Sequence, residues 1–118
     1  MWNTFEQSSF FMPVLLGSIF CVVGLIMFFF PPKKINPLYG YRTPRSMKSQ
    51  ERWDFAQRYS AKLLIASGVI MLLSGMVFYV LKLEGSSSVI AFFILLFGCL
   101  GILIYKTESL LKKTFKDE

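Results

Sequence analysis

The sequence predicts an all-α integral membrane protein with three transmembrane helices. Residues 10–30, 63–81 and 87–105 contain no Asp, Glu, Lys or Arg. Each stretch has about 19–21 residues and would measure roughly 28–31 Å as a helix, which matches a hydrocarbon core about 30 Å thick. The 118 residues, 54% of them hydrophobic, leave room for one membrane domain. A water-soluble fold of this size would not bury so much apolar surface.

The first apolar stretch is expected to be a retained helix and not a cleaved signal peptide. A signal peptide begins with basic residues and ends at a small-residue cleavage site. Residues 1–9 contain Glu6 and no Lys or Arg, and the stretch ends in three Phe residues followed by Pro31 and Pro32. The sequence therefore predicts a first membrane helix over residues 10–30.

The connection between the first and second helices, residues 31–62, is polar and does not begin as a helix. Prolines at positions 31, 32, 37 and 44 exclude a continuous helix through its first half. Gly40 stands between Tyr39 and Tyr41 and allows a tight turn that presents both rings. We therefore expect a structured loop next to the membrane.

The second half of this connection is expected to form an amphipathic cytoplasmic helix that leads into the second membrane helix, with or without a bend. Thr43 and Pro44 suit the N-cap and the first position of such a helix, and Ser46 and Ser49 are rival caps. Helical spacing groups the side chains on two faces. One face holds Trp53, Ala56, Gln57 and Ser60, and the other holds Arg52, Phe55, Tyr59 and Lys62.

The second and third helices are expected to be antiparallel neighbours, because residues 82–86 between them make a very short turn. Small residues recur at helical spacing on all three helices, and small side chains let helices approach closely in lipid. These stripes most simply mark the seams of one bundle, and a homodimer face is a compatible alternative. The stripes are Ser60-Ala61, Ser67-Gly68 and Ser74-Gly75; Ser87, Ala91, Ile94, Gly98, Gly101 and Tyr105; and Gly17, Cys21 and Gly24.

The distribution of positive charge predicts the orientation in the membrane. Of the 13 Lys and Arg residues, eight lie in residues 31–62 and four in the tail 106–118, whereas residues 1–9 have none and the short turn has Lys82. Lys and Arg are retained on the cytoplasmic side. We therefore expect the N-terminus outside and the long loop and C-terminus in the cytoplasm. There the basic loop would face anionic lipid headgroups, at about 1 kcal/mol per cation near the surface.

The residues that are missing exclude several function classes. The chain has no His, so it lacks an imidazole base and the commonest zinc ligand. Cys21 and Cys99 lie in the middle of helices and are expected to be packing residues. The three apolar stretches carry no charge, whereas proton and ion relays use ionisable groups within the membrane. We expect no enzyme, no metal or other cofactor and no nucleic-acid partner, and we interpret the net charge of +6 as a topology signal.

The best candidate for a binding site is the segment 36–44 together with Trp53. It places the guanidinium of Arg42 among two phenols, an amide, a hydroxyl and an indole. Such a group can bind a carboxylate or phosphate through paired hydrogen bonds and stack on aromatic surface. Alternatively, Arg42 pairs with a helix C-terminus or with Asp54, and the aromatic residues only anchor the loop. The candidate binding residues are Asn36, Tyr39, Gly40, Tyr41, Arg42, Thr43 and Trp53.

This segment resembles the SdpI/YfhL family of bacterial membrane proteins. As in that family, the segment lies between a first membrane helix and a closely spaced helical pair, and the likeness covers roughly residues 14–105. Gln57 departs from the pattern, because family members often have Asn after the Ala. The likeness is carried by Asn36, Tyr39-Gly40-Tyr41-Arg42-Thr43-Pro44, Ser46, Trp53 and Ala56.

The resemblance implies a protein of the bacterial cytoplasmic membrane that gives immunity to a membrane-active peptide toxin. The member that gives the family its name is longer, with extra membrane segments ahead of the shared unit, and it also sequesters a transcriptional repressor. Three functions follow as hypotheses. The chain binds a toxin, or a lipid that the toxin needs; or its basic loop recruits a cytoplasmic partner; or Tyr39, Tyr41 and Arg42 act on a lipid phosphate. The last hypothesis is the weakest, because no base or metal ligand accompanies the arginine.

Overall fold

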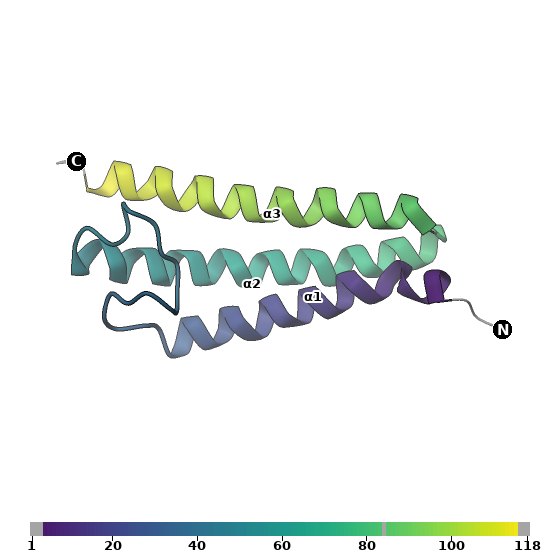
Figure 1. Cartoon of the computed structure of the whole chain (residues 1–118), viewed down its shortest axis with the longest axis horizontal. Helices are drawn as coiled ribbons and strands as arrows, with labels where there is room; N and C mark the ends of the chain where they lie inside the picture. Colours follow the sequence, from purple (N-terminus) through teal and green to yellow (C-terminus); the bar gives the residue numbers. More distant parts are fainter. Residues whose placement is uncertain (1–3, 84, 116–118) are drawn as a thin grey trace.

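Three long helices make up most of the computed structural model, which describes residues 4–83 and 85–115. They are α1 (Thr4–Phe29), α2 (Gln50–Leu81) and α3 (Gly85–Thr114). The helices lie side by side along the long axis, and α1 and α3 run opposite to α2 (Figure 1). The loop 30–49 lies at the same end as the end of α3. We call this part of the molecule the loop end.

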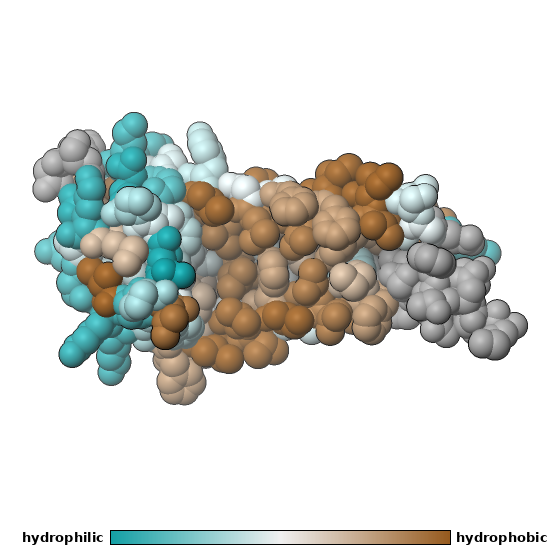
Figure 2. Space-filling view, in the orientation of Figure 1, coloured by the Kyte–Doolittle hydropathy of each residue, from teal (hydrophilic) through white to brown (hydrophobic). Residues whose placement is uncertain are grey.

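The predicted fold class is confirmed. Each helix contains a segment long and apolar enough to cross a membrane, and in α1 this segment is Phe11–Phe29. Figure 2 shows hydrophobic residues over the middle of the molecule and hydrophilic residues gathered at the loop end. This distribution indicates a multi-pass membrane protein, in which the apolar middle lies in the hydrocarbon core and the loop end lies in the headgroup layer and beyond it. The placement of the loop end in the cytoplasm stays a prediction.

The helix predicted to precede the second membrane span is the first part of α2, which continues without a break to Leu81. Its N-cap is Ser49, whose side chain accepts a hydrogen bond from the backbone N–H of Arg52. Of the three candidate caps, Thr43, Ser46 and Ser49, the structure therefore uses Ser49. Thr43 instead starts an isolated turn, closed by the bond from Met47 N to Thr43 O.

Of the two faces predicted on this part of α2, the first is buried. Trp53, Ala56, Gln57 and Ser60 are all 3% exposed or less. The opposite face packs less tightly, with the rings of Phe55 and Tyr59 stacked on each other. Phe115, just after α3, meets Phe55 edge to face. The loop end therefore has a small core of its own beyond the apolar spans.

The connection between α2 and α3 is as short as predicted. Lys82 adopts the left-handed conformation at φ 57°, and its backbone N–H donates to the carbonyls at the end of α2. Leu83 N also donates to Phe78 O, so the last carbonyls of the helix are satisfied, as in other left-handed helix ends. Glu84 lies outside the described residues. The reversal makes α2 and α3 antiparallel neighbours.

Glycines bring α1 and α2 into backbone contact. A Cβ atom added at Gly17 would lie 2.9 Å from Gly68 O, and one added at Gly68 would lie 2.7 Å from Gly17 O and 2.6 Å from Cys21 Sγ. At Gly24 an added Cβ would lie 3.0 Å from Ile65 N. Such close approach gives the dispersion contacts that hold helices together in lipid. The predicted seam is therefore confirmed for α1 and α2.

The small-residue stripe of α3 faces away from the bundle. A Cβ atom added at Gly98 or Gly101 would meet nothing within 4 Å, and Ile94 and Tyr105 are 69% and 73% exposed. The prediction that this stripe is a seam of the bundle was therefore wrong. The α2–α3 contact uses larger side chains instead, among them Phe92 and Leu103, which are buried.

Alanine at Gly68 should destabilise the protein, whereas alanine at Gly98 should not. Gly68→Ala places a methyl group against the backbone of α1, and overpacking of this kind costs about 1–3 kcal/mol. Gly98→Ala fills open space and improves helix propensity by up to about 1 kcal/mol. Thermal unfolding of both variants in detergent would measure the difference. Equal loss of stability in the two would contradict the assignment of the α1–α2 seam.

Candidate functional site

The side-chain amide of Gln57 holds the loop against α2. Its Nε2 donates to Tyr41 O and its Oε1 accepts from Tyr41 N, both at 2.7 Å. Gln57 is 1% exposed and Tyr41 is 9% exposed. Both polar groups of a buried peptide segment are thus satisfied by one side chain, which removes the penalty of burying them unpaired.

Gly40 is required by this pairing. Its φ of +105° is a conformation that residues with a Cβ rarely adopt. A Cβ at Gly40 would also collide with Gln57 Oε1 and lie 2.7 Å from Pro32 Cγ. The glycine therefore allows the loop to pass directly over Gln57 and sets the direction in which Tyr41 and Arg42 leave the turn.

Trp53 fixes the start of the loop. Its indole is fully buried, and Nε1 donates to Pro32 O at 2.7 Å. A buried indole N–H needs such an acceptor, and Pro32 offers a free carbonyl because the loop leaves the helical path after α1. Trp53 and Gln57 are one helical turn apart on the buried face of α2, so α2 carries both anchors.

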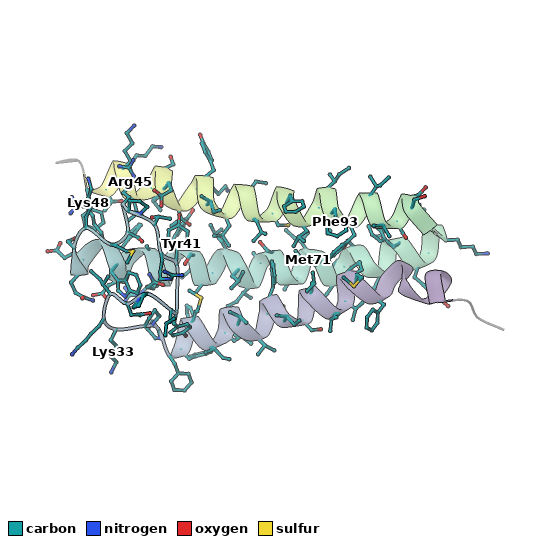
Figure 3. The ribbon with its side chains drawn as sticks, viewed as in Figure 1. Lys33, Tyr41, Arg45, Lys48, Met71 and Phe93 are labelled. Carbon is teal, nitrogen blue, oxygen red and sulfur yellow. The ribbon has the colours of Figure 1, made fainter. Side chains whose placement is uncertain are left out.

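The carboxylate of Glu108 ties the loop to α3. Its Oε2 accepts from Tyr41 Oη at 2.6 Å and from Thr43 Oγ1 at 2.7 Å. Its Oε1 lies 3.3 Å from Arg45 Nε, forming an ion pair whose side chains are 32% and 28% exposed. Figure 3 shows Tyr41 between α2 and α3, with Arg45 on the α3 side of the loop end. Charge-assisted hydrogen bonds of this kind are stronger than neutral ones.

The environment of Tyr41 raises the pKa of its phenol. Burial of the ring is the largest cause, and the hydrogen bond and negative charge of Glu108 add to it, while a hydrogen bond with Thr43 opposes it. On unfolding, the phenol would lose both the burial and the contact with Glu108 that favour its neutral form. The phenol is therefore a neutral donor to Glu108 over the physiological pH range.

A turn built around Ser46 shapes the segment after Arg42. Ser46 is fully buried, and its Oγ accepts from Thr43 N at 2.9 Å and donates toward Thr43 O at 3.0 Å. Thr43 Oγ1 in turn accepts from Ser46 N. This reciprocal pattern is the local side-chain-to-backbone bonding that Ser and Thr favour in turns.

The segment before Tyr41 is held by Asn36 and Tyr39. Asn36 Oδ1 accepts from the backbone N–H groups of Leu38 and Tyr39, an arrangement in which the side chain replaces a backbone turn. Tyr39 Oη donates to Phe30 O at 2.9 Å, at the end of α1. Leu38, at the tip of this turn, is 89% exposed.

Arg42 differs from the other six predicted site residues. Asn36, Tyr39, Gly40, Tyr41, Thr43 and Trp53 are used to build and attach the loop. Arg42 is exposed, and within residues 4–83 and 85–115 the ion pair of the loop is made by Arg45, three residues later. Asp54, the partner considered for Arg42, accepts from Gln50 instead. The structure thus separates a scaffold from one presented cation.

Three residues that carry the scaffold were not predicted from the sequence as site residues, namely Gln57, Arg45 and Glu108. Gln57 was predicted to share a helical face with Trp53 and was noted as a departure from the family pattern, but no anchoring role was predicted for it. For Glu108 the available signal was an acidic residue among Lys106, Lys112 and Lys113, just past the third span. An acid in that position needs a cationic or hydrogen-bonding partner, but the sequence does not say which loop residue supplies it.

The described residues contain no group of three or more His, Cys, Asp or Glu side chains that could hold a metal ion. What the loop end offers is a set of neutral donors already in use and several exposed cations. Guanidinium and ammonium groups beside apolar surface are suited to contacts with anionic groups.

These features define a small three-helix membrane protein whose first loop is attached to the second and third helices at one end of the bundle. The chain belongs to the SdpI/YfhL protein family, whose model matches residues 33–106. It is 42% identical over 96 residues to the uncharacterized protein YfhL of Bacillus subtilis (strain 168), covering 81% of this chain and 82% of that protein. No solved structure is similar enough to count as a match.

Replacing Gln57 with Leu should destabilise the protein far more than the same change at Gln50. Gln57→Leu leaves the buried N–H of Tyr41 unpaired, at about 1–3 kcal/mol, and leaves the Tyr41 carbonyl with Ser46 Oγ at 3.3 Å as its remaining donor. Gln50 is exposed and lies on the same helix, so Gln50→Leu is a matched control. Chemical or thermal unfolding in detergent would compare them, together with hydrogen exchange at the Tyr41 amide. Slow exchange of that amide in Gln57→Leu would show that another group holds the loop.

Stability should fall more steeply in the wild type than in Tyr41→Phe as the pH rises above 10. The fold raises the pKa of Tyr41 above its usual 10.0, so the contribution of the neutral phenol is complete below pH 10 and is lost at higher pH. Tyr41→Phe lacks this group and should be less stable at neutral pH. Unfolding temperatures measured from neutral to alkaline pH would give two converging curves, and parallel curves would contradict the assignment.

Proposed function

We propose that this protein protects the cell envelope against a membrane-active peptide toxin, by binding the toxin or a lipid that the toxin needs at the inner-leaflet loop. The observation that carries the proposal is the division of the loop into an attached scaffold and a presented Arg42. Six of the seven candidate residues build the loop or attach it to the helices, and the seventh, Arg42, is exposed.

Attachment of the loop favours binding because it lowers the entropy lost when a ligand orders its site. The backbone of Tyr41 is held on one side of Arg42 and that of Thr43 on the other, through Gln57, Glu108 and Ser46. The base of the Arg42 side chain is therefore fixed. Its planar guanidinium can then meet a carboxylate or phosphate through two hydrogen bonds.

Exposed apolar side chains beside Arg42 suit a ligand that lies in the membrane surface. Leu38 is 89% exposed and Tyr39 is 37% exposed, on the turn that precedes Gly40. Both a membrane-active peptide and a phospholipid combine apolar groups with charge, so the same surface can accept either. The excess of Lys and Arg at this end supports a position at the inner leaflet.

Membership of the SdpI/YfhL family supports the proposal at the level of immunity, since that is the function the resemblance implies. The residues that carry the resemblance are the same residues that build the loop.

A second candidate function is recruitment of a cytoplasmic protein by the loop. Met47 is exposed near Lys48, on the turn closed by Thr43. Exposed apolar and basic groups on one turn also suit an acidic protein partner. Retention of a soluble partner by isolated membranes, lost in Arg42→Ala, would favour this alternative over toxin immunity.

Arg42→Ala should abolish protection of a sensitive bacterium, and Arg42→Lys should restore it only in part. Lysine keeps the charge but lacks the planar fork, and a lost charge-assisted hydrogen bond costs about 1.5–3 kcal/mol. Survival under a related peptide toxin would be measured with the membrane level of each variant held equal. Lys34→Ala, also an exposed cation of the loop, is the matched control.

Two outcomes would contradict the proposal. Protection by Arg42→Ala equal to that of the wild type would leave Arg42 as a membrane anchor only. Failure of the wild-type protein to alter survival under any related toxin would exclude immunity itself.

A further inference from the structure

A cavity of about 210 Å³ lies at the loop end between α1 and α2. On one side it is bounded by the last turn of α1 and the prolines that follow, and on the other by the first turns of α2. Gln57 of the loop scaffold lines it, but neither Arg42 nor Leu38 does, so the cavity is distinct from the exposed surface around Arg42. Its lining residues are Met27, Phe28, Pro31, Pro32, Lys33, Gln50, Asp54, Gln57 and Arg58.

The cavity joins an apolar wall to three charged groups. Met27 is 6% exposed and Phe28 is 41% exposed, and both belong to the membrane-spanning segment of α1, which ends at Phe29. Lys33, Asp54 and Arg58 are all exposed. The cavity therefore lies where the apolar part of the bundle gives way to the polar loop end, at the depth of the lipid headgroups.

The charged groups that line the cavity form no ion pair with one another among the described residues. Asp54 and Arg58 are four residues apart on α2, a spacing that allows an ion pair, yet within the described part of the chain the ion pair present is Arg45–Glu108. Asp54 Oδ1 accepts from Gln50 Nε2, which orients the carboxylate and leaves its second oxygen for another donor. Figure 3 shows Lys33 on the α1 side of the loop end, away from Arg45.

We propose that this cavity binds the headgroup of a phospholipid that carries both a phosphate and a primary amine, as phosphatidylethanolamine does. Lys33 and Arg58 supply cations for the phosphate, and Asp54 supplies a carboxylate for the ammonium group. The acyl chains lie along the exposed end of α1, where Phe29 and Phe30 are 65% and 73% exposed.

The carboxylate of Asp54 makes the cavity more suitable for a headgroup with an amine than for a purely anionic headgroup. A site for a phosphate alone gains nothing from Asp54, because a like charge beside the ligand weakens binding. An amine attached to the phosphate by a short linker turns this repulsion into attraction. The apolar wall formed by Met27 and Phe28 in turn favours a lipid over the free headgroup, since buried apolar area adds to affinity.

Binding would be measured on the full-length protein by native mass spectrometry, after mixing with phosphatidylethanolamine or phosphatidylglycerol of equal chain length. We expect the wild type to prefer phosphatidylethanolamine. Arg58→Gln should weaken the binding of both lipids about tenfold, the effect of losing about 1.4 kcal/mol. Asp54→Asn should weaken phosphatidylethanolamine binding and strengthen that of phosphatidylglycerol, which reverses the preference.

Lys34→Gln is the control, because Lys34 is an exposed cation adjacent to Lys33 that does not line the cavity. It should bind both lipids as the wild type does, and the unfolding temperatures of all variants should match, since the substituted side chains are exposed. Equal binding by Arg58→Gln and Lys34→Gln would overturn the proposal. An unchanged preference in Asp54→Asn, or full competition by soluble phosphoethanolamine, would do so as well.

Discussion

The two hydrogen bonds between the Gln57 amide and the backbone of Tyr41 are the interaction on which the loop end depends. They pair the polar groups of a peptide segment that is buried at the headgroup layer. Without such partners, burial of these groups at that depth would cost free energy. The contact requires a glycine at position 40, because a side chain there would overlap the Gln57 side-chain oxygen. Once Tyr41 is held, its phenol reaches Glu108 and connects the loop to α3.

The site and the bundle are therefore one structure and not a loop added to three helices. α2 supplies Trp53 and Gln57 from a single buried face, and α3 supplies Glu108 from the turns that extend past its membrane span. In this arrangement the scaffold residues satisfy one another, while Arg42 and the cations near α1 remain available. In the proposed function, the position of Arg42 is set by the neutral and acidic residues of the scaffold, among them Gln57 and Glu108.

Within the apolar layer the helices are held together unequally. α1 meets α2 through Gly17, Gly24 and Gly68, at distances that leave no room for a Cβ atom. α3 touches α2 through larger side chains and turns its own glycines outward. The outward face is apolar, as the lipid requires, and it adds to the membrane character that dominates Figure 2.

The sequence by itself determined the class of the protein, the three spans and the residues of the loop. Long, uncharged apolar stretches are stable in the hydrocarbon core of a membrane. Glycine, proline and aromatic residues at fixed spacings restrict the conformation of the loop. The sequence also indicated which residues share a face of α2, because the spacing of residues on one face follows from the geometry of a single helix. These features depend on neighbours in the chain, so no knowledge of the fold was needed to find them.

Only the tertiary structure decided which partners these residues take. Thr43 and Ser49 were both suitable caps, and the choice followed from the attachment of Thr43 to Glu108, 65 residues away. Arg45 and not Arg42 forms the ion pair, and the glycines of α1 but not those of α3 lie in a seam. Local preference was nearly equal in each case, and the decision came from contacts between distant segments, which no local pattern in the sequence encodes.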